Sequence, residues 1–274
     1  MMLKSAEAGA KGVPLYEDDL LDEEAKDRQF VTALARGLDV LRCFRPGDVG
    51  LGNQEIAERT RLPKPTISRL TYTLTRLGYL TYSDRLGVYQ LGSGVLALGY
   101  AMLSGLDIRE RARPLMQDLA NDANASVALG TRDRLSMVYV ECCKGPGTVT
   151  LRLDVGSRVP IATTAMGRSL LSVLPEAERA YLMESMRERF PDRYPAVKAG
   201  IEKAMEEMDR HGFCLSLGDW QSDVHAVGVP LLSADRSAVF ALNCGGPSFI
   251  LSPDYLKNEA GPRLAEIARQ LTAR

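Results

Sequence analysis

The sequence has few of the residues on which metal-dependent and nucleophilic enzymes rely. Only two of its 274 residues are histidines, and its five cysteines are an odd number with no C-x-x-C pair. Neither a disulfide framework nor a cysteine or histidine metal site is therefore indicated. We expect no metal, no cofactor, and reduced, buried thiols. The cysteines are Cys43, Cys142, Cys143, Cys214 and Cys244.

Long hydrophobic runs are also absent. The longest apolar stretch, GVLALGYAML at residues 94–103, is about half of the roughly 20 residues that a transmembrane helix requires. The amino terminus lacks the charged-then-apolar pattern of a signal peptide. We therefore expect a cytoplasmic protein with no membrane partner. With 45% hydrophobic and 25% charged residues, the chain can form one large or two ordinary domains.

The formal net charge is only -1, but two segments have charged residues almost entirely of one sign. Residues 17–27 contain seven acids and only Lys26 as a base, whereas residues 59–85 contain six basic residues and only Asp84 as an acid. We interpret residues 1–27 as a mobile acidic tail. The basic segment is a candidate contact for nucleic acid.

Residues 28–93 have the pattern of a winged helix-turn-helix domain. A first helix from Phe30 ends at Pro46, a second is NQEIAERT with its cap at Gly52 or Asn53, and a third follows the turn before Lys64. YLTYSDRLGVYQLG then predicts a hairpin. In the first helix, Leu34, Leu38, Leu41 and Phe44 lie on one helical face. In the third helix, the stripe expected to be buried is Ile67, Leu70, Leu74 and Leu77.

The third helix presents an outward face without an acid. In a helix-turn-helix this helix lies in the major groove, and Pro65 suits its first turn, where no N–H is needed. At about 100° per residue, the outward positions are Pro65, Ser68, Arg69, Tyr72 and Arg76, with Thr66 on one flank. Arginine can bind guanine bidentately, so Arg69 is a candidate base reader. Phosphate contacts are expected from Arg61, Lys64, Arg76 and Arg85.

The remaining sequence predicts a connector helix at residues 94–108 and a mixed α/β domain at residues 109–274. We interpret the connector and the helix after it as a dimer contact. Strands and helices then interleave around what is most simply one sheet. The expected strands are residues 126–131, 135–143, 148–155, 213–217, 224–232 and 239–244, and the expected helices are residues 165–174, 176–189, 195–211 and 253–271. The fold class is therefore α+β with two domains.

Four stretches, in order, are similar to one known family. They are LARGLDVLRCF with EIAERTRLPKPTISRLTYTLTRLGYL, then TTAMGRSLL, then HGFCLSLGDWQSDVHAVGVPLL, and finally FALNCGGP. The chain resembles the isocitrate-lyase-regulator (IclR) family of bacterial transcription factors over nearly everything after about residue 28. The resemblance implies a GAF-like α/β domain that binds a small-molecule effector. It also implies homo-oligomers, dimers of dimers, on a palindromic operator in double-stranded DNA.

Carried over position by position, the resemblance implies an effector pocket in the second domain. Its residues would be Thr164, Ala165 and Met166 at a helix start, Ser216, Asp219 and Ala226, Asn243 and Gly245, and Leu151 and Leu153 as an apolar wall. Free N–H groups at a helix start attract a carboxylate. Ser216 stands where a carboxylate is common in the family, so we expect an organic acid or aromatic compound larger than a two- or three-carbon acid. Trp220 would cover the pocket or pack on its rim.

We therefore expect a sequence-specific DNA-binding regulator whose operator binding is modulated by a metabolite. Two alternatives stay open from the sequence alone. The second domain could sense a metabolite and act through protein contacts, or it could be an enzyme joined to a DNA-binding module. Ser169 in GRSLL lacks the G-x-S-x-G setting of a nucleophile elbow, and the two histidines have no metal-ligand spacing, so we expect no enzyme.

Overall fold

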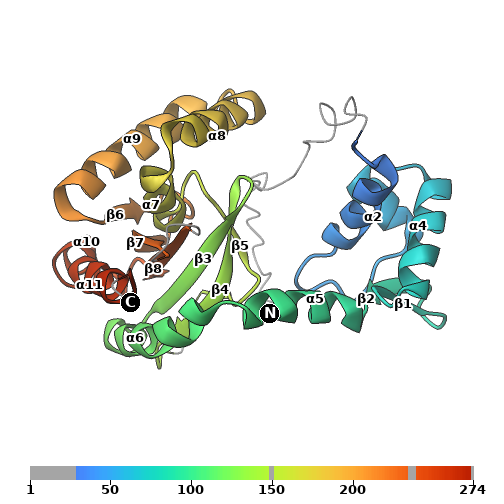
Figure 1. The fold of residues 1–274 in the computed structure, drawn as a ribbon, viewed down its shortest axis with the longest axis horizontal. Helices are drawn as coiled ribbons and strands as arrows, with labels where there is room; N and C mark the ends of the chain where they lie inside the picture. Colours follow the sequence, from blue (N-terminus) through green and yellow to red (C-terminus); the bar gives the residue numbers. More distant parts are fainter. Residues whose placement is uncertain (1–28, 148–150, 234–238, 273–274) are drawn as a thin grey trace, which may run out of the picture. The chain divides into compact units, whose positions relative to one another are not determined.

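The computed structural model describes residues 29–147, 151–233 and 239–272. They form two compact units, and the chain passes from the first to the second between residues 106 and 107 (Figure 1). The predicted acidic tail, residues 1–27, lies outside the described residues. The structure confirms the α+β class, with a helix-turn-helix unit followed by an α/β unit. The exact domain boundaries stay predictions.

The first unit is a winged helix-turn-helix. Its elements are α2 (Thr32–Arg42), α3 (Asn53–Thr60), α4 (Lys64–Arg76), β1 (Leu80–Ser83), β2 (Val88–Leu91) and α5 (Ser93–Ser104). Helix α3 starts after Gly52, whose N–H donates to Glu55 Oε2 at 2.9 Å. A short turn leads into α4, which has Pro65 in its first turn. Strands β1 and β2 form the predicted antiparallel hairpin.

The buried stripe predicted for α4 is only partly correct, and the apolar face of α2 is only partly covered. Its buried core consists of Val40, Leu51, Ile56, Ile67, Leu74 and Leu80. Leu34 and Leu38 of α2 are 63% and 46% exposed, and Leu77 of α4 is 64% exposed. Thr71 is buried on α4 instead, and its hydroxyl donates to Ile67 O at 2.9 Å. Helical spacing identifies the apolar face of a helix, but it does not show which other element packs against that face. In this small unit, the other elements cover only part of each apolar face.

The second unit contains one antiparallel sheet in the order β5-β4-β3-β8-β7-β6. Its strands are β3 (Ser126–Asp133), β4 (Ser136–Lys144), β5 (Arg158–Pro160), β6 (Cys214–Leu217), β7 (Val224–Leu232) and β8 (Val239–Pro247). Its helices are α6 (Asp107–Ala123), α7 (Ala165–Val173), α8 (Glu176–Arg189), α9 (Tyr194–His211), α10 (Pro253–Tyr255), the π-helical η1 (Leu256–Ala260) and α11 (Gly261–Thr272). The predicted helix 253–271 is thus divided into three elements.

The strand predicted at residues 148–155 is wrong in its described part. Residues 151–155 form no regular element, and the unpredicted strand β5 follows them. The reason is a turn around Asp154: its N–H donates to Ser157 Oγ at 2.8 Å, and its carbonyl accepts from Ser157 N at 2.9 Å. Gly156 takes a φ of 87° in this turn. The turn residues therefore override the alternating pattern before them.

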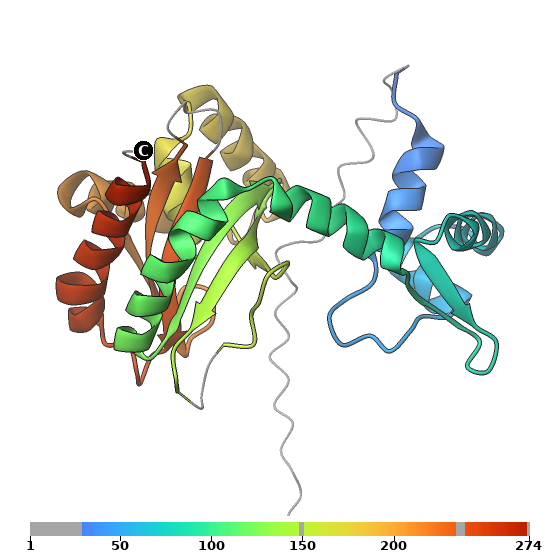
Figure 2. The same cartoon turned by 60° about the horizontal axis from the view of Figure 1, so that its bottom comes forward.

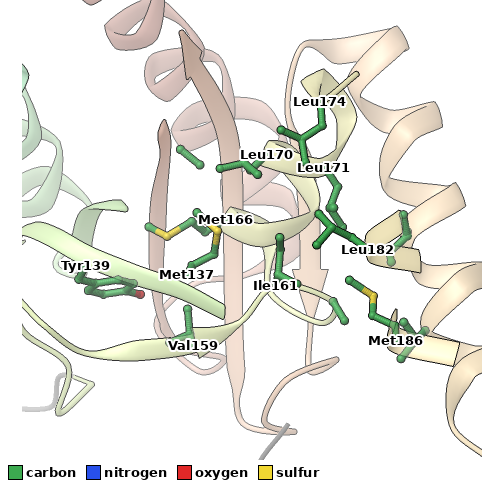
Figure 3. Packing of buried hydrophobic residues seen from close by; sticks show 14 of the residues in the cluster. Met137, Tyr139, Val159, Ile161, Met166, Leu170, Leu171, Leu174, Leu182 and Met186 are labelled. Carbon is green, nitrogen blue, oxygen red and sulfur yellow. The ribbon is translucent and has the colours of Figure 1, made fainter. Parts of the chain in front are cut away.

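Helices cover both faces of the sheet. Helices α6 and α11 pack side by side on one face (Figure 2). Helix α7 packs on β7 and β8 from the other face, with α8 and α9 beyond it (Figure 1). One cluster of buried side chains lies on the α7 face, and Figure 3 shows it extending from Tyr139 and Val159 past Met166 to Leu182 and Met186. The start of α7 therefore lies directly over the strands.

Candidate functional site

The outward face of α4 is exposed, as the sequence predicted. The exposed side chains are Lys64, Pro65, Ser68, Arg69, Tyr72 and Arg76, whereas Thr66 is half-buried. Tyr72 presents 66% of its surface to solvent. Arg61 lies in the turn before α4 with a φ of 57°, and Arg85 lies in the exposed turn of the β1–β2 hairpin. The geometry is compatible with binding in a major groove, and the contacts of each residue stay predictions.

One residue of the basic segment has a structural role instead. Arg59 donates to Asp48 Oδ2 at 2.6 Å and to Cys43 O at 2.9 Å, so it fixes the loop between α2 and α3. The Arg59 guanidinium holds the pKa of the Asp48 carboxyl below its usual value. On α4 itself, Ser68 Oγ lies 3.4 Å from Asn53 Nδ2 at the start of α3. The two helices of the motif are thus held together beside the candidate base-reading positions.

A pocket lies in the second unit at the start of α7. It is lined by Tyr139, Leu151, Val159, Thr164, Ala165, Met166, Ser216, Trp220, Val224, Ala226, Asn243 and Gly245. Of the predicted effector residues, only Leu153 and Asp219 are outside this lining. Tyr139, Val159 and Val224 were not predicted, because their place depends on strand register. The centre of a water molecule can occupy only about 20 Å³ of this pocket. An effector must therefore displace lining side chains.

The strand register explains the floor of the pocket. Ser216 of β6 lies opposite Ala226 of β7, and Ala226 lies opposite Gly245 of β8. Three small residues therefore form a row across three adjacent strands, because residues in direct register point to the same face. Small side chains leave the space into which the first turn of α7 and a ligand can fit.

The polar groups of the pocket are few and uncharged. Thr164 caps α7 by accepting from Gly167 N at 3.1 Å, and its hydroxyl donates to Pro160 O at 2.7 Å. Among the described residues, the N–H groups of Ala165 and Met166 have no acceptor. Asn243 Oδ1 is likewise buried without a hydrogen-bond partner there. The pocket thus offers two backbone donors and one amide acceptor to a ligand within apolar walls.

The cysteines of the described part are buried or half-buried, and they gather into no metal site. There, no three histidine, cysteine or acidic side chains gather as a metal site would need. Cys143, Cys214 and Cys244 are buried, and Cys43 and Cys142 are half-buried. Burial raises the pKa of Cys43 and of Cys142 to about 11. Over the same residues, no helix has both the length and the apolar character to cross a bilayer.

The raised thiol pKa values predict slow alkylation of the native protein. With pKa values of about 11, Cys43 and Cys142 are almost wholly protonated at pH 8. We expect iodoacetamide to label them roughly 100-fold more slowly than free cysteine, with a rate that rises about tenfold per pH unit. Mass spectrometry of peptides after timed labelling measures this, with the urea-unfolded protein as the control. Labelling at the rate of the unfolded chain would contradict the prediction.

Comparisons with known proteins agree over both units. Residues 33–84 match the model of the IclR helix-turn-helix domain, and residues 100–273 match that of the bacterial transcriptional regulator IclR C-terminal region. The HTH-type transcriptional regulator TsaQ1/TsaQ2 of Comamonas testosteroni is 34% identical over 245 residues, covering 89% of this chain and 88% of that protein.

Solved structures give the same result. The crystal structure of an IclR family transcriptional regulator from Brucella abortus is 51% identical, with a TM-score of 0.81, and the match covers 91% of this chain and 94% of that one. An IclR homologue from Microbacterium hydrocarbonoxydans, solved in complex with 4-hydroxybenzoate, has the same fold at 20% identity. That match has a TM-score of 0.68 and covers 88% of this chain and 96% of that one.

Proposed function

Because the chain belongs to the IclR family of bacterial transcriptional regulators and is a DNA-binding regulator, we propose that α4 reads an operator and that an effector in the α7 pocket changes this binding. The observation that carries the proposal is the exposed, acid-free face of α4 around Arg69. Helix α4 would lie in the major groove, with Arg69 at base edges and Lys64 at a phosphate. Effector control requires that the ligand prefer one DNA-binding state of the protein.

The pocket chemistry favours an aromatic or other organic acid as effector. The unpaired N–H groups of Ala165 and Met166 at the start of α7 suit a carboxylate. Asn243 Oδ1 suits a hydroxyl or amino donor, and the walls from Tyr139 and Trp220 suit a ring. The Microbacterium homologue binds 4-hydroxybenzoate, which has a ring, a carboxylate and a hydroxyl. This compound is therefore the first probe for the pocket.

The exposed apolar side chains of α5 support a homodimer. Helix α5 has no buried residue, and its apolar residues Leu96, Leu98, Tyr100 and Met102 are between 48% and 75% exposed. A second copy of the chain would cover this surface, since exposed apolar patches mark protein contacts. Sedimentation of the wild type and of Leu96→Glu tests this. We expect a dimer or larger assembly in the wild type and a shift towards monomer in the variant; a monomeric wild type would overturn the proposal.

Capture of genomic DNA tests the proposed function directly. Purified protein is mixed with sheared genomic fragments at near-physiological salt, and the retained fragments are sequenced. A shared palindromic site among them would support operator reading. Retention of fragments without a shared motif, or of none, would favour the alternative in which the protein acts through protein contacts.

Arg69→Ala is expected to weaken binding to the recovered operator by roughly 1–3 kcal/mol and to relax the preference at one base pair. Lys64→Ala provides the matched comparison, because it removes an exposed cation from the same helix. A phosphate contact carries no sequence information, so the Lys64 variant should lose affinity equally for operator and random duplexes. Mobility-shift titrations measure both. Equal losses on both duplexes for Arg69→Ala would reassign this residue to the phosphates.

A further inference from the structure

A buried arginine in α7 is bound to the loop that carries the single tryptophan of the chain. Arg168 is only 4% exposed. Its Nε donates to Ala162 O at 2.9 Å, and its Nη1 donates to Asp219 Oδ2 at 2.5 Å. Arginine is seldom fully buried unless it is paired. Here the paired carboxylate comes from outside α7, so the guanidinium joins α7 to the loop of residues 218–223.

This loop is internally ordered, and it is attached to α7 through Asp219. Gly218 N donates to Val224 O at 3.0 Å, and Val224 N donates to Gln221 O at 2.9 Å. Within the described residues, the Asp219 carboxylate makes the one side-chain hydrogen bond from this loop to another element. The neighbouring Trp220 packs against the buried cluster on the α7 face and lines the pocket. Asp219 is therefore placed to determine where the indole ring lies.

The space for the guanidinium is provided by Gly200 of α9, which is not a lining residue of the pocket. A Cβ at position 200 would lie 2.3 Å from Arg168 Nη2 and 2.9 Å from Arg168 Cζ. Such distances are too short for non-bonded atoms, so a side chain here would displace the guanidinium. Gly200 thus allows the pair to be disturbed from outside the pocket.

From these contacts we propose that Arg168 is a positioning residue of the effector pocket, which holds Trp220 as a pocket wall through its bond to Asp219. This proposal rests on the proposed function, because the pocket is taken to be the effector site. The contacts of Arg168 themselves are present in the protein without effector. Arg168 touches no ligand in this scheme. An ordered wall lowers the entropy lost on binding, so the pair increases the affinity for an effector.

The single tryptophan makes the test possible without labelling, because all tryptophan fluorescence comes from Trp220. Acrylamide quenching is measured on the full-length protein without ligand, for Asp219→Asn, Gly200→Ala and their combination. We expect each single variant to increase the quenching constant about two- to threefold, with a red-shifted emission, because the loop opens more often. The combined variant should show no further increase, since both changes act on the same pair.

The matched control is Asp223→Asn, which removes the same charge from the same loop at an exposed position. Its quenching should equal that of the wild type. Unfolding curves are recorded for all variants, because a purely structural role would lower stability without exposing Trp220 in the native state. Unchanged quenching in both single variants, or an additive increase in the combined variant, would overturn the proposal.

A second measurement separates this proposal from the proposed function. Titration with 4-hydroxybenzoate, followed by Trp220 fluorescence, should give a dissociation constant about tenfold higher for Asp219→Asn than for the wild type. Equal constants would overturn the role in affinity. If the wild type does not respond while the quenching results hold, the positioning role of Arg168 is supported and the proposed effector class is wrong.

Discussion

Replacement of Gly228 by alanine is expected to destabilise the second unit by about 3 kcal/mol and to distort the pocket. Gly228 lies in β7, and an added Cβ would lie 2.4 Å from Ala165 O and 2.8 Å from Met166 N. These are backbone atoms in the first turn of α7, so no side-chain rotation relieves the contact and the helix itself must move. Ala165 and Met166 also line the pocket, so stability and effector binding should be lost together.

Chemical unfolding followed by Trp220 fluorescence measures this loss, because that residue reports on the second unit. Gly212→Ala is the control. Gly212 ends α9 with a φ of 77°, and nothing lies within 4 Å of an added Cβ. This change should cost only about 1 kcal/mol, from the left-handed backbone alone. Equal losses for the two variants would show that the contact with α7 is not what requires glycine at position 228.

The sequence predicted local elements well because their start and stop residues are local signals. Helix α8 begins and ends where predicted, after Pro175, and β7 has the predicted bounds 224–232. The turn into α4 and the hairpin of the wing followed from Pro65 and the residues around Asp84. These signals depend only on residues that are adjacent in the sequence, so the sequence alone is enough to recognise them.

The pocket was predictable only in part. Positions such as Thr164 and Asn243 came from the resemblance to a family, and the structure brings them together around one cavity. Tyr139 and Val159 could not be found, because they reach the pocket through the pairing of β4 with its neighbours. Asp219 was expected in the lining, but it pairs with Arg168 beside it. Long-range pairing of this kind leaves no periodic signal in a single sequence.

Because of a bulge, strand β4 contributes side chains both to the pocket and to the contact with α6, the first helix of the second unit. Gly130 of β3 pairs with Tyr139, but Leu129 pairs with Glu141, so Val140 is an extra residue. The bulge places Glu141 towards α6, whereas Tyr139 lines the pocket on the other face. Without the extra residue, alternation would put both side chains on the same face.

Glu141 is buried and neutralised by two arginines of α6. Its Oε2 accepts from Arg109 at 3.2 Å and its Oε1 from Arg113 at 2.8 Å, while its own side chain is 5% exposed. The two arginine side chains are 23% and 60% exposed, so they can reach water but the carboxylate cannot. The asymmetry means that removal of the arginines costs more than removal of the acid.

The double variant Arg109→Met/Arg113→Met is therefore expected to lose about 3 kcal/mol of unfolding free energy, because it leaves a buried carboxylate without a cation. Adding Glu141→Met should recover most of this loss, since no buried charge then remains. Arg210→Met is the control: it breaks a pair with Glu206 whose side chains are 70% and 67% exposed, and it should cost less than about 1 kcal/mol. Urea unfolding measures the free energy of unfolding of all three variants. A triple variant no more stable than the double variant would contradict this. It would show that Arg109 and Arg113 hold α6 against β4 by packing, and that their charge interaction with Glu141 contributes nothing to stability.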